Sequence, residues 1–281
     1  MTNTRSANRL THWLAATALA LGLAPQAAQA APAWQINTSG QGASGATAVS
    51  TVAVGGVGFV EIIPSASNPT GFTFVEHGAY QLLQSSGSAP FGSQDLTVAY
   101  SVSGTGSFLN PLALHFTTGS ISLYVDTLFD FGSSAGNFGA DNGTLLGSFS
   151  VIDGGLAPTG LVSVQARLNK GSLLSGYLFD GNGNDLTSAD NVLMQLGVFN
   201  QVTIPDPLLV SEIVCGLSGS TGDGCNGHSA FTNTPFAYTV RDGGGVALST
   251  VPEPGSIGLL LAGLGLIPVA ARRRRLATKQ D

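Results

Sequence analysis

Charged residues are scarce in this sequence, where only 9% of the 281 residues are Asp, Glu, Lys or Arg. Basic side chains are rarest between residues 31 and 250, where three of them stand against fourteen acidic ones and leave a formal charge of −11. A phosphate backbone finds few cationic partners on such a chain, so the composition argues against nucleic-acid binding. Cations, sugars and other surface polymers fit this charge better.

Signatures of catalysis are sparse as well. The sequence has no His-Glu-x-x-His pair for a catalytic zinc and no Gly-Lys phosphate loop. His77, which follows Glu76, and His115 each lack a visible nucleophile nearby. The sequence therefore predicts a protein that is not an enzyme. A polysaccharide hydrolase with two paired carboxylates stays open as an alternative, because a sequence gives no distances between carboxylates.

The first thirty residues have the pattern of a secretory signal peptide. A basic segment precedes an apolar run over residues 13–24, and the small residues Ala28 and Ala30 follow it. The run is shorter than the roughly 20 residues that a membrane span needs. We expect export by Sec-type machinery with cleavage after Ala30; the alternative is an uncleaved anchor.

The other end of the chain combines a Pro-Glu-Pro element, an apolar run over residues 256–271 and a basic cluster. This pattern predicts one C-terminal transmembrane helix that inserts transiently, with residues 276–281 as a cytoplasmic tail. Prolines hold the preceding segment extended, as a peptidase groove requires. The Pro-Glu-Pro element is Pro252, Glu253 and Pro254, and the arginines that stop the helix are Arg272, Arg273, Arg274 and Arg275.

These three elements in this order resemble the PEP-CTERM sorting domain, which here spans residues 251–275. The resemblance implies recognition by an exosortase, a membrane Cys transpeptidase that cuts near the Pro-Glu-Pro element. It also implies an inner-membrane intermediate, followed by the cell surface or extracellular matrix as the destination. An ordinary C-terminal membrane anchor is the alternative.

Cys215 and Cys225 are the two cysteines of the chain. Export into an oxidising compartment favours a disulfide between them, which would contribute about 2 to 3 kcal/mol by closing a short loop. A metal site would need further Cys or His ligands at zinc-like spacing, which the neighbouring sequence lacks.

The body of the chain reads as mainly β. Residues 31–58 are rich in Gly, Ser and Ala and predict a flexible leader, whereas residues 59–250 predict a β-rich exported domain. Short alternating runs separated by Gly-rich turns favour an antiparallel β-sandwich or jelly-roll. Residues 118–120 are predicted as a hairpin turn, 208–215 as a strand and 189–196 as the single short helix of the body.

A Gly-rich acidic turn is the best candidate for a metal site. Alternate oxygen side chains on such a turn can converge on a hard cation such as calcium. A plain turn explains the same residues equally well. The candidate ligands are Asp180, Asn182, Asn184 and Asp185.

Four segments of the body resemble flocculation-associated PEP-CTERM proteins, namely residues 72–78, 96–100, 123–126 and 149–151. This resemblance implies a secreted component that works with exopolysaccharide in cell aggregation, in flocs or biofilm. The resulting hypothesis is a non-enzymatic surface or matrix protein. Its alternatives are a calcium-assisted carbohydrate-binding module and a polysaccharide hydrolase.

Overall fold

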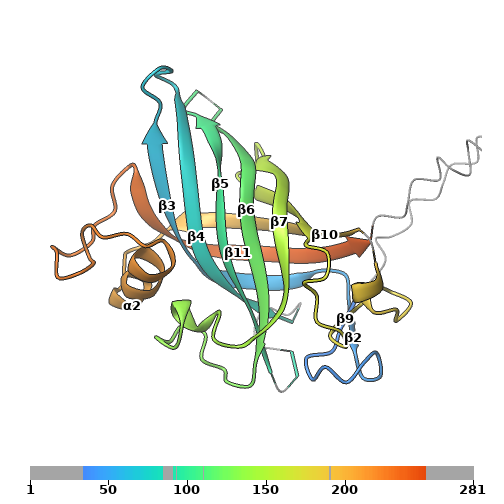
Figure 1. Cartoon of the computed structure of the whole chain (residues 1–281). Coiled ribbons are helices and arrows are strands. Elements are labelled where there is room, and N and C mark those ends of the chain that lie inside the picture. Colours follow the sequence, from blue (N-terminus) through green and yellow to red (C-terminus); the bar gives the residue numbers. More distant parts are fainter. Residues whose placement is uncertain (1–33, 85–90, 93, 110, 190, 251–281) are drawn as a thin grey trace, which may run out of the picture. The chain divides into compact units, whose positions relative to one another are not determined.

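Eight antiparallel strands close into a barrel in the computed structural model of the protein, which describes residues 34–84, 91–92, 94–109, 111–189 and 191–250 (Figure 1). Neighbouring strands around the barrel follow the chain, and β11 returns to pair with β3. The strands are β3 (Val52–Pro64), β4 (Gly71–Leu83), β5 (Asp95–Ser107), β6 (Ala113–Asp126), β7 (Thr144–Leu156), β8 (Val162–Leu168), β10 (Val192–Val202) and β11 (Ala237–Thr250).

The predicted sandwich or jelly-roll is therefore wrong, although the mainly β class is right. Alternating inward and outward residues look the same in a sandwich and in a barrel. Closure depends on the long-range pairing of β11 with β3, which runs from Ala237 opposite Glu61 to Val246 opposite Val52. No local pattern in the sequence reports that pairing.

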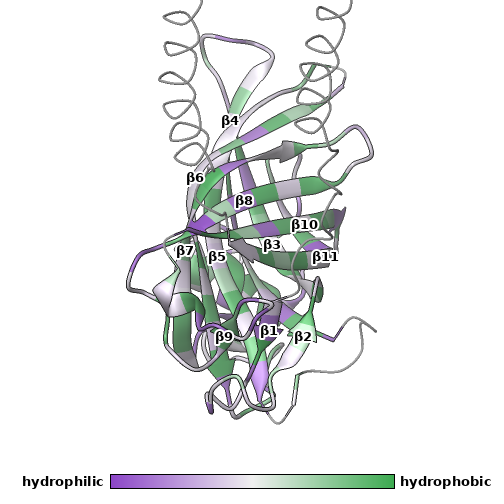
Figure 2. Cartoon of the chain, turned by 90° about the vertical axis from the view of Figure 1, so that its right-hand side faces the viewer, coloured by the Kyte–Doolittle hydropathy of each residue, from purple (hydrophilic) through white to green (hydrophobic). Residues whose placement is uncertain are grey.

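The barrel interior is filled by inward side chains at alternate strand positions. Leu96, Val98, Tyr100 and Val102 of β5 all point inward and are buried. Figure 2 shows hydrophobic residues along β8 and β10, which also contribute to this core. An eight-stranded barrel is just wide enough for side chains to fill it or to enclose one small ligand.

A separate three-stranded sheet lies against one end of this core. It consists of β2 (Thr47–Val49), β1 (Trp34–Ile36) and β9 (Leu178–Phe179), in that order. Trp34 and Leu178 belong to the barrel core cluster. The prediction of a flexible leader at residues 31–58 is therefore wrong from Trp34 onward. This segment supplies β1, β2 and the first half of β3, because its few apolar residues are buried.

Helical structure at residues 207–217 replaces the strand predicted at 208–215. The helix comprises α2 (Pro207–Leu209) and η4 (Val210–Leu217), and the Asp206 side chain caps its first turn by accepting from the N–H groups of Leu208 and Leu209. Its buried residues recur with a helical period and pack on the outside of the barrel, against β3, β4 and β5. They are Leu209, Val210, Ile213 and Val214.

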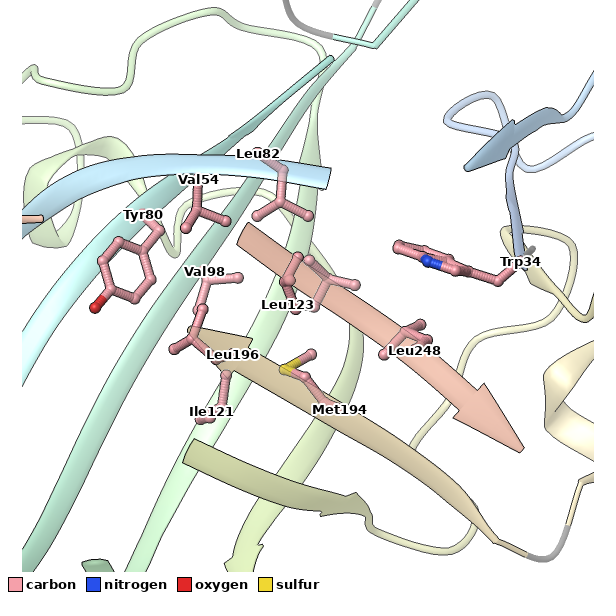
Figure 3. Close-up of a pocket in the computed structure, with 11 residues that line it drawn as sticks. Trp34, Val54, Tyr80, Leu82, Val98, Ile121, Leu123, Met194, Leu196 and Leu248 are labelled. Atoms are coloured by element: carbon pink, nitrogen blue, oxygen red, sulfur yellow. The ribbon is translucent and has the colours of Figure 1, made fainter. Parts of the chain in front are cut away.

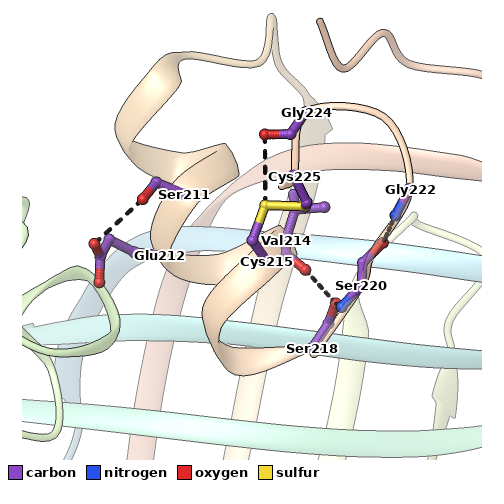
Figure 4. The surroundings of a disulfide bond; sticks show 9 residues. All are labelled: Ser211, Glu212, Val214, Cys215, Ser218, Ser220, Gly222, Gly224 and Cys225. Atoms are coloured by element: carbon purple, nitrogen blue, oxygen red, sulfur yellow. Dashed lines mark hydrogen bonds between the residues drawn. A yellow bond between two sulfur atoms is a disulfide. The ribbon is translucent and has the colours of Figure 1, made fainter. Parts of the chain in front are cut away.

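The predicted disulfide is confirmed. Cys215 at the end of the helix is bonded to Cys225, with their Cα atoms 5.6 Å apart, and Figure 4 shows the loop that this bond ties back to the helix. Cys225 is buried in the same outer cluster as the helix. The bond therefore fixes the loop that follows the helix to the outer wall of the barrel.

Two smaller predictions are also corrected. The turn at residues 118–120 lies within the continuous strand β6, where Gly119 (φ +153°) approaches Val102 of β5 too closely for a side chain. The helix at residues 189–196 is a strand from Val192 onward, and the helical turn is η3 (Leu186–Ser188) instead. In both segments long-range pairing overrides local preference.

Of the helices that the structure describes, none has the length and hydropathy needed to cross a bilayer. The predicted transmembrane helix at residues 256–271 lies outside the described residues. So do the signal peptide with Ala28 and Ala30, the Pro-Glu-Pro element, the arginine cluster and residues 276–281.

Candidate functional site

Five polar residues converge inside the barrel and form what we call the interior polar cluster. They lie on four strands and occupy inward positions that the neighbouring core residues share. In the strand register Asn200 is opposite Asp242, Asp242 is opposite Gly56, and Gly56 is opposite Tyr80. The members are Glu76 and Tyr80 of β4, Tyr100 of β5, Asn200 of β10 and Asp242 of β11.

The Tyr100 hydroxyl is the centre of the cluster. It lies 3.0 Å from Glu76 Oε1 and 3.3 Å from Asp242 Oδ2. The Tyr80 hydroxyl lies 3.1 Å from that of Tyr100 and 3.3 Å from Asp242 Oδ2, and Asn200 Nδ2 donates to Glu76 Oε1 over 3.3 Å. Each phenol has one proton, so the two hydroxyls cannot serve all of these acceptors at once.

Two glycines make space for the Tyr100 hydroxyl. A Cβ atom at Gly78 would lie 2.3 Å from this oxygen, and one at Gly58 would lie 2.8 Å from it. Both distances are shorter than van der Waals contact allows. Glycine at these inward positions therefore permits the hydroxyl to reach both carboxyl groups.

Burial makes the carboxyl groups of Glu76 and Asp242 weaker acids than exposed carboxyl groups. It raises the pKa of Glu76 to about 7, against the weaker opposing effect of the hydrogen bonds from Tyr100 and Asn200. Burial and the charge of Glu76 raise the pKa of Asp242 to about 8. Burial is also the main reason why the pKa values of Tyr80 and Tyr100 lie well above the usual value. Near neutral pH the pair of carboxyl groups thus retains protons that exposed carboxylates would lose.

Two oxygens of the cluster receive no hydrogen bond from the described residues. They are Oδ1 of Asp242 and Oδ1 of Asn200, and both atoms are buried. No basic side chain compensates the carboxyl groups, because Arg167, Lys170 and Arg241 of the described body are exposed. The cluster combines hydroxyl, carboxyl and amide groups and carries up to two negative charges.

A small apolar cavity separates the cluster from the Trp34 end of the barrel. Its volume is about 20 Å³, and its lining includes Trp34, Tyr80, Met194 and Leu248. Figure 3 shows Trp34 on one side of this space and the ring of Tyr80 on the other. This volume is far below the roughly 300 Å³ of a small-molecule pocket, and the apolar lining offers a water molecule no hydrogen-bond partner.

The acidic turn that sequence analysis favoured for calcium is held together by its own hydrogen bonds. Asp180 Oδ1 accepts from the N–H groups of Asn182 (2.8 Å) and Asn184 (2.9 Å), and Asp180 Oδ2 accepts from Asn184 Nδ2. Asp185 accepts from the N–H groups of Thr187 and Gly176. Although burial alone would raise them, these bonds lower the pKa values of Asp180 and Asp185. Calcium binding here stays a prediction, since turn formation already uses both carboxylates.

The histidines do not join a catalytic arrangement among the described residues. His77 points to the outside of the barrel whereas Glu76 points inward, because successive strand residues face opposite sides. His115 Nδ1 lies 3.7 Å from Asp153 Oδ1 on the exposed surface. Residues 132–136 spell Gly-x-Ser-x-Gly, so a nucleophile-elbow motif is present by letter although none is expected from the sequence. No hydrogen bond joins Ser134 to a histidine among the described residues, and the short 3-10 turn η2 (Asn137–Gly139) follows the motif in place of an α-helix.

The comparisons with known proteins concern the C-terminal segment. The family model of the PEP-CTERM protein-sorting motif matches residues 250–275. The chain is a PEP-CTERM protein. As such it is targeted to an exosortase for export and surface sorting, and the match includes Pro252, Glu253 and Pro254. No curated protein and no solved structure matches this PEP-CTERM protein, so the resemblance to flocculation-associated proteins gains no support.

The sequence pattern does not predict the interior polar cluster as a site. A signal for it was nonetheless present, because Glu76 interrupts an inward row of Phe72, Phe74, Tyr80 and Leu82 on one strand. An acidic residue in phase with such a row predicts a buried carboxyl group. Its partners on β10 and β11 could not be found without the strand order.

Proposed function

We propose that this PEP-CTERM protein is a non-enzymatic component of the cell surface or extracellular matrix that supports exopolysaccharide-associated cell aggregation. The sorting motif at residues 250–275 is the observation that carries the proposal. Export through an inner-membrane intermediate followed by exosortase processing would bring the barrel into contact with matrix polymers.

The burial of the carboxyl pair supports a non-enzymatic role. Glycoside hydrolases hold their two carboxyl groups on either side of the scissile bond, in a cleft that a sugar chain can enter. Here Glu76 is 5% exposed and Asp242 is 4% exposed, inside a closed barrel. A polysaccharide chain cannot reach them.

An apolar rim at one barrel end supports contact with other matrix components. It comprises Ile63, Val202, Ile204 and Phe236, whose exposed fractions range from 47% to 87%. These residues lie on adjoining strand ends, since the N–H of Ile62 donates to the carbonyl of Phe236 and Val202 is opposite Val240. Exposed apolar groups gathered in this way are typical of interaction surfaces.

A deletion strain tests the role in aggregation. We expect settling and floc size to fall at unchanged exopolysaccharide yield, and the complete gene to restore them. A gene with Pro252→Ala, Glu253→Ala and Pro254→Ala should fail to restore them, whereas the matched control Asp180→Asn in an exposed turn should succeed. Normal aggregation of the deletion strain would refute the proposed role.

Processing is tested by the mass and location of the protein in cells with and without the exosortase. Loss of the C-terminal segment and appearance outside the cell should both require the peptidase. Equal mass and location in the two strains would contradict processing, whatever the aggregation assay shows.

A further inference from the structure

The apolar rim lies at an end of the barrel, here called the rim end, whose connections carry no charged residue. The β3–β4 connection (residues 62–75), the β5–β6 connection (residues 103–114) and the chain that enters β11 (residues 229–240) contain no Asp, Glu, Lys or Arg. Exposed apolar side chains continue beyond the rim, because Phe108 and Leu109 of the β5–β6 connection are 45% and 59% exposed. The rim end is therefore apolar and uncharged over several connections.

Backbone contacts hold these connections next to one another. The carbonyl of Phe236 accepts from the N–H of Ile62, which joins the start of β11 to the end of β3. The N–H of Phe108 donates to the carbonyl of Thr70 over 2.7 Å, and the ring centroids of Phe108 and Phe72 lie 4.4 Å apart. The exposed apolar residues thus follow neighbouring strand ends from β10 through β11, β3 and β4 to β5.

The opposite end of the barrel, where Trp34 packs, is acidic. The acidic side chains nearest the rim end are Glu61, Asp153 and Asp206, and Asp206 caps the helix. Six others lie at the Trp34 end, on the β6–β7 connection, at the adjoining strand ends and beside β9. They are Asp95, Asp126, Asp130, Asp141, Asp180 and Asp185. Because like charges repel, two copies of this acidic chain meet with least repulsion at their rim ends.

The chain leaves the barrel at the acidic end. Strand β11 begins at Ala237 beside the rim and ends at Thr250, and its 14 residues span about 45 Å at the usual rise of a strand. The sorting motif at residues 250–275 follows directly. A protein held through this side of the chain therefore directs its rim end away from the point of attachment.

We propose that the rim end is a self-association surface on which a second copy of this chain docks rim to rim. A two-fold pair brings the same apolar residues of both copies into contact and keeps the two acidic ends apart. The two C-terminal ends then point in opposite directions, as a link between two cells requires. This last step rests on the proposed function, whereas the pairing itself does not.

The charge distribution predicts how salt affects the pairing. Apolar contact brings together two bodies that each carry a formal charge of −11. Salt screens their repulsion, with a Debye length of about 10 Å at 0.1 M ionic strength. Pairing should therefore become tighter as salt is added, whereas a contact made by ion pairs would become weaker.

Sedimentation equilibrium of the mature protein, purified from cells, measures the pairing. We expect a monomer–dimer equilibrium with a dissociation constant of about 1 to 100 µM, typical of a small transient interface. The dimer should be tighter in about 0.5 M NaCl than in about 0.05 M NaCl. A monomer at every concentration in both salts would overturn the proposal, and so would a dimer that salt weakens.

Variants locate the contact. Ile63→Asp places one carboxylate from each copy in the two-fold interface and should weaken the dimer about tenfold or more. Ile204→Asp is the second rim variant, and circular dichroism checks that both are folded. Leu128→Asp is the matched control on the β6–β7 connection, because Leu128 is 60% exposed and Ile63 is 61% exposed; it should leave the dimer unchanged.

Two outcomes for these variants would overturn the proposal. One is a dimer that both rim variants leave intact or that Leu128→Asp removes. The other is a monomeric protein that binds phosphatidylcholine vesicles and loses this binding with Ile63→Asp. That result would assign the rim end to a lipid surface.

Mixed cultures separate this inference from the proposed function. Deletion cells that carry the complete gene are mixed with differently labelled deletion cells that carry the Ile63→Asp gene or the Leu128→Asp gene. Flocs should exclude the first variant and include the second, and equal inclusion of both would refute pairing between cells. Normal aggregation of the deletion strain would refute the proposed function and leave a dimer in solution standing. Poor aggregation of that strain with a monomeric purified protein would refute the self-association alone.

Discussion

The rings of Tyr80 and Tyr100 stack inside the barrel with their centroids 4.7 Å apart and their planes 15° from parallel. This stacking places both hydroxyls on the same side, next to the carboxyl groups of the interior polar cluster. The phenol pair therefore joins the apolar core to the polar cluster: its rings belong to the former and its oxygens to the latter. Removing one hydroxyl should expose how far the carboxyl groups depend on it.

Tyr100→Phe should lower the free energy of unfolding by about 1 to 3 kcal/mol, because it preserves the ring stack and leaves buried carboxyl oxygens without a donor. Urea unfolding followed by fluorescence measures this change. Tyr177→Phe is the control, since Tyr177 is only partly buried and lies outside the cluster; it should change stability by less than about 0.5 kcal/mol. Equal effects of the two substitutions would contradict the assigned role of Tyr100.

Stability should fall as the pH rises through neutrality in chelator-treated buffer. Folding raises the pKa of Glu76 from 4.5 to about 7 and that of Asp242 from 3.8 to about 8, so the folded chain binds more protons than the unfolded chain between these values. The stabilisation is complete below about pH 4 and is lost as the pH passes 7 and 8. Urea unfolding at intervals from pH 5 to pH 8.5 measures this slope.

Glu76→Gln should flatten that pH dependence without removing it, because Asp242 and Asp95 also have raised pKa values. Asp180 and Asp185 have lowered pKa values and therefore affect stability only in more acidic solution. A stability that increases from pH 5 to pH 8 would contradict the raised pKa values of Glu76 and Asp242.

Gly78→Ala should destabilise the barrel by about 1 to 3 kcal/mol. The added methyl group would lie 2.3 Å from the Tyr100 hydroxyl and 2.5 Å from the carbonyl oxygen of Val57. Gly55→Ala is the matched control, because a methyl group on that neighbouring strand meets nothing within 4 Å. Thermal unfolding of both variants should show a clear loss for the first and little change for the second.

Replacing Cys215 and Cys225 by alanine should cost about 2 to 3 kcal/mol and leave the barrel folded. The bond closes a loop on the outer wall, and both cysteines belong to the outer cluster that surrounds the helix. Circular dichroism should retain its β signal while limited proteolysis cuts faster between residues 218 and 236. Loss of the β signal would mean that the helix and its loop are needed for barrel closure.

Local pattern was enough to place several strands but not to assemble them. Alternation identified residues 96–102, because inward Leu96, Val98 and Tyr100 differ in size and polarity from their outward neighbours. It misread residues 208–215, where apolar side chains also fit a helix that packs on the outside of the barrel. Only the burial of one face distinguishes a helix from a strand at these residues. That burial exists only once the barrel has closed and offers an outer wall to pack against.

The candidate sites likewise include residues that lie close together in sequence and residues that meet only in the folded chain. Asp180 to Asp185 stand together in sequence and can be named from it as candidate ligands, whereas Glu76 and Asp242 meet only because β11 closes onto β3 and β3 pairs with β4. Gly56 and Gly58 fill the positions between them, where larger residues would keep the carboxyl groups apart. The sequence pattern predicts a flexible leader at those glycines. In the folded chain they line the cluster.

β11 ends at Thr250, opposite Val192, only two residues before Pro252. A pull on the chain beyond Thr250 acts along the strand axis, and the backbone hydrogen bonds of an antiparallel ladder are perpendicular to that axis. The ladders to β10 and β3 are then loaded in shear, so their bonds share the force and do not open one by one. A cell held through this end of the barrel would strain two ladders together before the fold opened.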